Sequence, residues 1–205
     1  MPHNARVFII DDDAAMRDSL EFLLGTAGFA VTPFGSAAQF LDALPHLGFG
    51  CLVTDIRMPE VDGIELLKRL KTASIKLPVV VMTGHGEVPL AVEAMKLGAI
   101  DFLEKPFEDE RLIGMLKMAL EQSIKNTKIA ADTVELAARL ASLSPRERQI
   151  MEGLVAGLSN KMIANKYDIS PRTVEVYRAN VMTKMHAANM SELVKLAIRS
   201  GTLDS

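Results

Sequence analysis

Apolar and polar positions in residues 1–122 follow two alternating patterns. Short apolar runs alternate with longer stretches whose apolar residues recur at helical spacing. The runs are Val7–Ile10, Ala30–Thr32, Cys51–Thr54, Val79–Met82 and Ile100–Leu103. The helical stretches are Ala14–Ala27, Ser36–Leu44, Ile64–Ala73, Val88–Leu97 and a last helix from Glu108 onward. Strands that alternate with helices in this way predict an α/β fold, a five-stranded doubly wound parallel sheet.

The pattern changes after residue 122. Residues 123–142 are compatible with a helix but weakly patterned, which predicts a helical linker that continues the last helix. Ser144, followed by Pro145 and Glu147, is typical of a helix start. Four further helices are predicted, over about 145–156, 160–167, 171–185 and 191–199. We therefore expect an α/β domain over 1–122, a helical linker over 123–142 and an all-α four-helix domain over 143–205.

Composition and charge narrow the classes of protein. Half of the residues are hydrophobic (49%), but there is no long apolar run, so we expect a soluble chain without a transmembrane or secretory segment. The single cysteine, Cys51, fits a reducing cytoplasm. Residues 1–122 hold 11 Lys+Arg and 18 Asp+Glu, a balance of −7, whereas residues 123–205 hold 12 and 8, a balance of +4. The basic second part suggests a polyanionic partner.

Polar residues follow the apolar runs at the points where the predicted strands end. Asp11 and Asp12 follow the first run, Asp55 the third, Thr83 the fourth and Lys105 the fifth. Because the carboxyl ends of parallel strands meet at one edge, three carboxylates, a hydroxyl and an ammonium are expected in one pocket. Each residue alone is also common in a cap or a turn. Together, in this order, they predict a site for a divalent cation and a phosphoryl group.

The chemistry of these groups assigns roles to them. Asp12 and Asp55 can hold Mg²⁺, which prefers oxygen ligands, and Asp11 would act mainly through a bound water. Asp55, at the centre of the sheet, is the best placed nucleophile and would form an acyl phosphate. Lys105 and the hydroxyl of Thr83 would meet phosphoryl oxygens.

The order of these residues resembles the receiver domain of two-component response regulators. The motifs are Asp11-Asp12, Asp55, Met58-Pro59, Asp62-Gly63, Thr83-Gly84, Gly98-Ala99 and Lys105-Pro106. The resemblance covers 1–122 and implies a flavodoxin-like fold. It also implies that Asp55 accepts a phosphoryl group from a histidine kinase, with Mg²⁺ bound by Asp12, Asp55 and the backbone carbonyl of Arg57.

The same resemblance implies a switch formed by Thr83 and Phe102. The family often has Tyr at the position of Phe102, and Phe lacks the hydroxyl that could report its position by a hydrogen bond. His85 lies in the segment 83–86, and we interpret it as a loop residue that shapes the switch region rather than as a catalytic base.

The segment 160–185 has helix-turn-helix form, with Ser170 and Pro171 opening its second helix. Steps of 100° place Val174, Val181 and Met185 on a core-facing side. The residues on the opposite side suit a DNA major groove: Arg172, Thr173, Val176, Ala179, Asn180 and Thr183, with Lys184 at the edge.

Three further residues of this domain have expected roles. Lys184 and Lys161 are better placed for DNA phosphates than for bases. Arg178 falls near the buried side, so we predict a partly buried ion pair, for example with Glu147.

This second part resembles the LuxR-type DNA-binding domain, and its union with a receiver is typical of the NarL/FixJ class. The motifs are 143–148, 157–161 and 169–176. Two stretches, within 83–96 and over 172–182, are similar to the nitrogen-fixation regulators of rhizobia. That likeness implies an oxygen-sensing kinase of the FixL kind, promoter DNA of nitrogen-fixation and microaerobic genes, and RNA polymerase as partners. We expect a cytoplasmic transcriptional activator that pairs into a homodimer through the surface 88–103 when phosphorylated.

Two other classes of protein fit parts of the pattern. A haloacid dehalogenase-type phosphatase would use Asp11 as nucleophile and Asp13 as acid/base, but this leaves the basic helical part unexplained. A receiver that controls a protein-binding helical domain is the second alternative. We expect the regulator rather than an enzyme.

Overall fold

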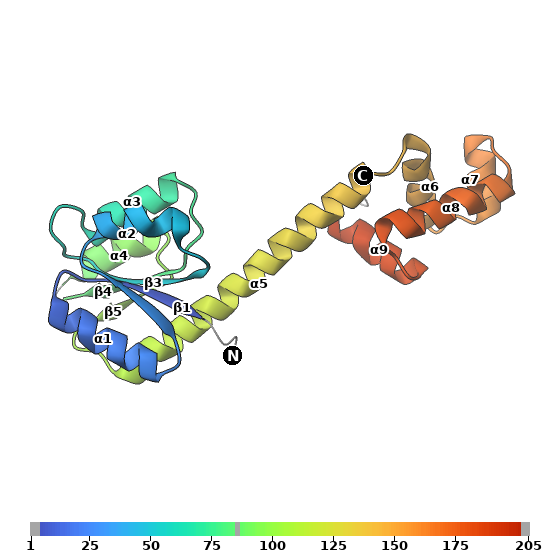
Figure 1. The fold of residues 1–205 in the computed structure, drawn as a ribbon. Helices are drawn as coiled ribbons and strands as arrows, with labels where there is room; N and C mark the ends of the chain where they lie inside the picture. The colour runs from blue at the N-terminus through green and yellow to red at the C-terminus, as the bar shows by residue number, and fades with distance from the viewer. Residues whose placement is uncertain (1–4, 85–86, 202–205) are drawn as a thin grey trace. The chain divides into compact units, whose positions relative to one another are not determined.

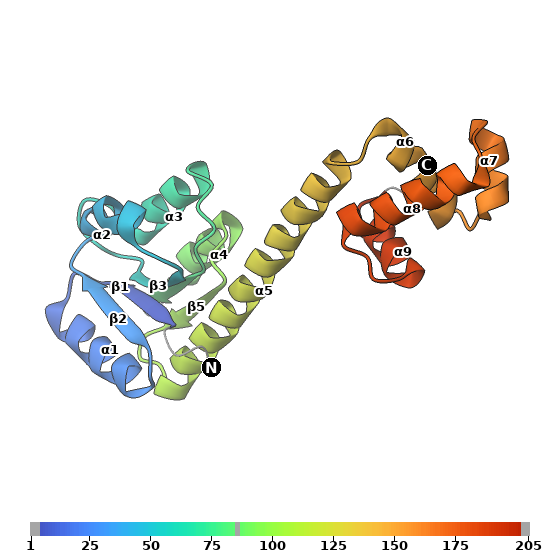
Figure 2. The same ribbon diagram turned by 45° about the vertical axis from the view of Figure 1, so that its right-hand side comes forward.

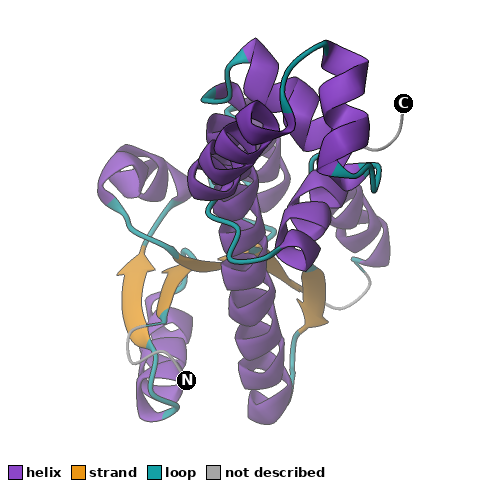
Figure 3. Ribbon diagram, turned by 90° about the vertical axis from the view of Figure 1, so that its right-hand side faces the viewer, coloured by secondary structure: helices purple, strands orange, loops and turns teal. Residues whose placement is uncertain are grey.

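The structure, a computed structural model, describes residues 5–84 and 87–201. The chain divides into two compact units, residues 1–125 and residues 126–205. The described strands all belong to the first unit, and the second unit is helical (Figure 3).

The first unit is built on one parallel sheet. Its strands are β1 (Arg6–Ile10), β2 (Ala30–Phe34), β3 (Gly50–Asp55), β4 (Val79–Thr83) and β5 (Asp101–Glu104). They are arranged in the order β2-β1-β3-β4-β5, and every neighbouring pair is parallel. This order reverses between β1 and β3, as it does in flavodoxin-like folds. The predicted five-stranded doubly wound sheet is confirmed.

Helices cover both faces of this sheet (Figure 1). They are α1 (Ala14–Thr26), α2 (Ala37–Ala43) with the short 3₁₀ helix η1 (Leu44–His46), α3 (Gly63–Thr72), α4 (Val88–Leu97) and α5 (Asp109–Ala141). One core lies between the sheet and α2, α3 and α4, and the other lies between the sheet and α1 and α5. Because alternate strand residues point to opposite faces, strands buried on both faces are apolar throughout, as the sequence pattern indicated.

Polar side chains start the helices at the edge where the strands end. Asp13 caps α1 by accepting the N–H of Ala15 at 2.9 Å, and Asp62 caps α3 by accepting the N–H of Glu65 at 2.7 Å. At the other end of α4, Gly98 adopts the left-handed conformation (φ 108°) that glycine enters without steric cost. Asp13 and Asp62 thus begin α1 and α3 just after the loops that follow β1 and β3.

The second unit packs α6 (Pro145–Val155), α7 (Asn160–Tyr167), α8 (Pro171–Met185) and α9 (Met190–Arg199) around one core (Figure 2). The start of α6 is a complete capping box: the hydroxyl of Ser144 accepts the N–H of Glu147, whose carboxylate accepts the N–H of Ser144. Residues predicted to be weakly helical, 123–141, belong to α5, which is 33 residues long and continuous.

Candidate functional site

The register of the sheet brings the predicted polar residues to one edge. Ile10 of β1 pairs with Thr54 of β3, so Asp11 and Asp55 follow paired positions on adjacent strands. Thr83 ends β4 and pairs with Glu104, which directly precedes Lys105. Asp11, Asp55, Thr83 and Lys105 therefore gather at the carboxyl edge, beside the point where the strand order reverses.

One ammonium joins the two buried carboxylates. Lys105 Nζ donates to Asp55 Oδ1 at 2.7 Å and to Asp11 Oδ2 at 3.0 Å. The remaining oxygens accept backbone N–H groups: Asp55 Oδ2 that of Arg57 at 3.0 Å, and Asp11 Oδ1 that of Asp13 at 2.9 Å. Asp11 is 2% exposed and Asp55 is 9% exposed. The contacts fix both carboxylates, and Asp55 keeps more exposed surface than Asp11.

Burial and charge act in opposite directions on this pair. Burial raises the pKa of Asp55 above its usual value, and the repulsion from Asp11 adds to it, although the hydrogen bond and charge of Lys105 act against the shift. Burial alone would lower the pKa of Lys105, but Asp55 and Asp11 outweigh it and raise that pKa. Lys105 therefore places its positive charge beside a carboxyl group whose pKa lies above the usual range.

The other predicted residues of the site lie in different environments. Thr83 is buried, and its carbonyl accepts the N–H of Lys105 at 2.8 Å. Phe102 is half-buried and packs against the core under α2, α3 and α4. Asp12 is exposed, so the structure does not bring its carboxylate into the buried group with Asp11 and Asp55. His85 lies outside the described residues.

Mg²⁺ prefers oxygen ligands, and the carboxyl edge of the sheet supplies several. Among the described residues, no three His, Cys, Asp or Glu side chains are grouped as a ready metal site. Asp11 and Asp55 are buried whereas Asp12 is exposed, so the convergence of all three carboxylates on one ion stays a prediction. Mg²⁺ nevertheless needs only one or two carboxylates, with waters and phosphate oxygens completing its shell. The oxygen donors of Asp11 and Asp55, with exposed Asp12 adjacent in sequence, fit it.

A glycine holds the helix behind the site close to the acceptor strand. A Cβ added at Gly63 would lie 2.6 Å from the backbone oxygen of Asp55 and 3.0 Å from the Cα of Ile56. Both neighbours are backbone atoms, so no side-chain rotation could relieve the overlap. The sequence motif contained Gly63, but only the structure shows that the absence of a side chain there lets α3 pack against Asp55.

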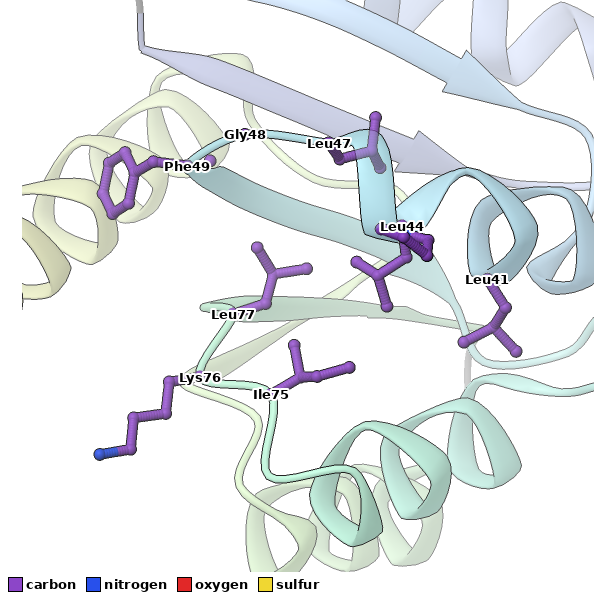
Figure 4. A pocket seen from close by; sticks show the side chains of 10 residues that line it. Leu41, Leu44, Leu47, Gly48, Phe49, Ile75, Lys76 and Leu77 are labelled. Carbon is purple, nitrogen blue, oxygen red and sulfur yellow. The ribbon is translucent and has the colours of Figure 1, made fainter.

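A cavity of about 550 Å³ lies at the opposite, amino edge of the sheet (Figure 4). Its lining includes leucines of α2 and η1, Phe49 just before β3, and the segment 75–77 before β4. The ammonium of Lys76 extends away from these apolar side chains (Figure 4). None of the predicted site residues contributes to this cavity.

The second unit presents the face of α8 that the sequence predicts. Val174, Val181 and Met185 are fully buried. Five residues of the opposite side are exposed: Arg172, Val176, Ala179, Asn180 and Thr183. Thr173 is half-buried, and its N–H and hydroxyl both contact the hydroxyl of Ser170, the residue that caps α8. Lys161, on α7, is exposed.

The predicted ion pair of Arg178 with Glu147 is wrong. Glu147, 5% exposed at its side chain, accepts Lys184 Nζ at 2.7 Å, and the same ammonium donates to the carbonyl of Ser142 at 3.1 Å. Lys184 and the N–H of Ser144 lower the pKa of Glu147. The end of α8 lies at the start of α6, which brings Lys184 rather than the half-buried Arg178 within reach. Lys184 is therefore engaged inside the unit, whereas it was predicted as a phosphate contact.

We expect Lys184→Ala to destabilise the second unit by about 1–3 kcal/mol, because a buried carboxylate loses its cation. A lowered pKa stabilises the fold above the unfolded value of 4.5, and this contribution disappears as the pH falls through the folded value. The loss caused by Lys184→Ala should therefore be largest near neutral pH and shrink in acid, as measured by urea unfolding. The matched control is Arg172→Ala, on the exposed side of α8, which should unfold like the wild type. Equal stability of the two variants at pH 7 would contradict this assignment.

Comparison with known proteins places both units in families. Residues 7–117 match the response regulator receiver domain, and residues 141–197 match the LuxR family of bacterial regulatory proteins. The chain therefore belongs to the two-component response regulators that join a receiver to a LuxR-type DNA-binding domain, and it is a transcriptional regulator.

Its relatives include nitrogen-fixation regulators. The chain is 65% identical over 204 residues to the transcriptional regulatory protein FixJ of Bradyrhizobium diazoefficiens, with 100% of both chains covered. Among solved structures it is similar to full-length FixJ from B. japonicum (66% identity, TM-score 0.63, 97% and 98% of the chains covered). It is also similar to the response regulator StyR (38% identity, TM-score 0.86, 95% and 98% covered). This chain is thus a FixJ-like regulator. None of the helices in its described part has the length and apolar character needed to span a bilayer.

Proposed function

We propose that Asp55 accepts a phosphoryl group from the phosphohistidine of a sensor kinase, and that this controls binding of the second unit to promoter DNA. One observation carries the proposal: Lys105 holds Asp55 and Asp11 together at the carboxyl edge of the sheet, and Asp55 is the more exposed of the two carboxylates. We assign the receiver to 1–122, the linker to 123–142 and the DNA-binding domain to 143–205.

In the transfer, a carboxylate oxygen of Asp55 attacks phosphorus as the bond to the donor's imidazole nitrogen breaks. Mg²⁺, held by Asp12, Asp55 and the carbonyl of Arg57 with Asp11 acting through a water, would neutralise charge on the phosphoryl group. Lys105 then pairs with one phosphoryl oxygen, and the hydroxyl of Thr83 donates to another. The half-buried ring of Phe102 turns inward to fill the space that Thr83 leaves.

These contacts must supply enough energy to operate a switch. Moving a conformational equilibrium from 1:99 to 99:1 needs about 5.5 kcal/mol, whereas one charge-assisted hydrogen bond contributes about 1.5–3 kcal/mol. The hydroxyl of Thr83 alone is therefore insufficient. Lys105, the packing of Phe102 and the pairing of two receivers must provide the remainder.

The surface 88–103 suits such pairing because it exposes several large apolar side chains. These are Val88, Val92 and Met95 of α4 and Ile100 before β5. Apolar groups gathered on one exposed face are typical of an interaction site. Two paired regulators would then place their α8 helices in half-sites about one helical turn apart, roughly 34–36 Å.

We expect the unphosphorylated chain to sediment mainly as a monomer, and acetyl phosphate to shift it toward a dimer. The variant Val92→Asp places a charge within the apolar surface and should keep the phosphorylated chain monomeric without preventing phosphorylation. Phe22→Asp, an equally conspicuous exposed apolar position on α1, is the matched control and should still dimerise. A phosphorylated wild type that remained monomeric would contradict the proposed pairing.

The DNA-binding assignment rests on the exposed side of α8. We propose that Arg172, Thr173, Val176, Ala179 and Asn180 meet base edges. Lys161 would contact phosphate; Lys184 would join it only by leaving Glu147. We further propose a kinase of the FixL kind, nitrogen-fixation and microaerobic promoters, RNA polymerase as a further partner, and the cytoplasm as the location.

Phosphotransfer from an autophosphorylated, radiolabelled sensor kinase tests the proposal, with the label mapped by peptide analysis. The label should appear on Asp55. We also propose that the chain is no phosphatase of small phosphomonoesters, because Asp13 is engaged as the cap of α1 and Asp11 is held by Lys105. Turnover of a phosphomonoester that is lost in Asp11→Asn but kept in Asp55→Asn would favour the enzyme instead.

A further inference from the structure

Glu87 stands at the start of α4, but its carboxylate does not cap that helix. Helices usually begin with Asp, Asn, Ser or Thr at this position, whose short side chains accept an N–H from the first helical turn. Here Glu87 Oε2 accepts the N–H of Gly84 at 2.7 Å, and the other oxygen pairs with the guanidinium of Arg57. The side chain of Glu87 is 10% exposed, whereas that of Arg57 is 74% exposed, so the carboxylate is largely buried and its cationic partner reaches it from the surface.

The Glu87 carboxylate joins the loop that follows Asp55 to the loop that follows β4. Gly84 directly follows Thr83, the hydroxyl donor of the proposed switch. Arg57 lies two residues after Asp55, and its N–H donates to the Asp55 carboxylate. A Cβ added at Gly84 would lie 3.4 Å from the carboxyl carbon of Glu87, so the carboxylate rests directly against the backbone there.

We propose that Glu87 is a positioning residue that holds Thr83 and Gly84 in their resting place and must release the N–H of Gly84 before Thr83 can reach a phosphoryl group. The inference deepens the proposed function and rests on phosphorylation of Asp55. Inward movement of Thr83 displaces the adjoining N–H of Gly84 from Glu87. A phosphoryl group of nearly two negative charges is also a stronger acceptor for that N–H than a single carboxylate.

Release of Glu87 has a direct consequence for α4. The backbone carbonyl of Glu87 accepts the N–H groups of Leu90 and Ala91, so its main chain is part of the first turn of the helix. The next residues on this helix include Val88 and Val92, which belong to the surface 88–103. Glu87 therefore links the contact beside the acceptor to the surface proposed for dimerisation.

The test is the affinity of the full-length chain for beryllofluoride, a phosphoryl mimic, titrated calorimetrically in the presence of Mg²⁺. Glu87→Gln keeps the shape of the side chain but loses its charge, and with it the ion pair with Arg57. Because a charge-assisted hydrogen bond is about twice as strong as a neutral one, the resting state should be weakened enough to tighten beryllofluoride binding by about tenfold. Glu87→Ala should act in the same direction and more strongly.

Glu65→Gln is the matched control, because Glu65 lies on α3, outside the surface 88–103, and likewise pairs with an arginine, Arg69, at 2.9 Å. It should bind beryllofluoride like the wild type. If Glu87 merely stabilised the fold, its variants would melt at a lower temperature and bind beryllofluoride equally or more weakly, and that result would overturn the inference. Failure of the wild type to bind beryllofluoride, or a radiolabel absent from Asp55, would instead remove the proposed function.

Discussion

We expect Asp55→Asn to abolish labelling by a phosphorylated sensor kinase and by acetyl phosphate. An amide is not a nucleophile toward phosphorus, and of the two described carboxylates that contact Lys105, Asp55 is the more exposed. We expect a loss of at least a hundredfold in the initial labelling rate, and with it the loss of phosphorylation-dependent dimers. Quantitative labelling of the intact chain, followed by peptide mapping, measures both the rate and the site.

The control for this variant is Asp42→Asn, which changes an exposed acid on α2. It should be labelled like the wild type. Labelling of Asp55→Asn at the wild-type rate would show that another residue accepts the phosphoryl group and would contradict the assignment of Asp55.

Asp55→Asn should also change how the free energy of unfolding depends on pH. The pKa of Asp55 is raised in the folded chain, chiefly by burial, so ionising this group costs folding free energy. The wild type should lose stability relative to Asp55→Asn as the pH rises from the unfolded value of 3.8 through the raised folded value. Urea unfolding between pH 4 and 7 measures this difference. A difference that shrinks with rising pH would contradict the direction of the shift.

Gly63→Ala is expected to impair both the fold and the site. Its methyl group would lie 2.6 Å from the backbone oxygen of Asp55, so α3 or β3 must move. Overpacking of this kind costs about 1–3 kcal/mol of unfolding free energy. Because a displacement near 1 Å can cost about a hundredfold in a reaction that depends on alignment, we expect labelling to fall by at least tenfold.

Gly25→Ala provides the matched control on α1. A Cβ there meets no atom within 4 Å, so this substitution should be neutral or stabilise the helix by about 0.4–1 kcal/mol and leave labelling unchanged. Normal labelling and wild-type stability of Gly63→Ala would show that the close approach of α3 does not hold Asp55 in place.

Much of the fold could be predicted from the local pattern of apolar and polar residues. The helix α8 was expected over 171–185 and spans Pro171–Met185, because Ser170 and Pro171 mark its start and its buried residues recur at helical spacing. The strand expected over 30–32 extends to Phe34, through Pro33. Proline is tolerated there because β2 is an edge strand with one neighbour. The continuous α5 was only partly expected, since its exposed middle has a weak apolar pattern.

The partners of individual side chains were harder to predict from the sequence. Long side chains such as Lys184 and Glu87 can reach several neighbours, and the choice depends on how closely two elements pack. Glu147 was expected to bind a cation of α8, and it does so, but the cation comes from Lys184 instead of Arg178. Glu87 had no role in the motif, although it lies four residues after Thr83. Nothing in the linear pattern indicates that its carboxylate turns back to Gly84.

The amino-acid sequence by itself determined the class of this regulator: two units, a parallel sheet, and acceptor, cation and hydroxyl groups that follow successive strands. These features follow from periodicity and from the rule that parallel strands end at one edge, which need no knowledge of packing. Only the tertiary structure decided that Asp11 and Asp55 share Lys105 while Asp12 faces solvent, that Gly63 lets a helix approach the acceptor, and that Glu87 bridges two loops. Hydrogen bonds and ion pairs form over about 3 Å, and distances of that size between residues far apart in the chain are set by the packing of whole elements.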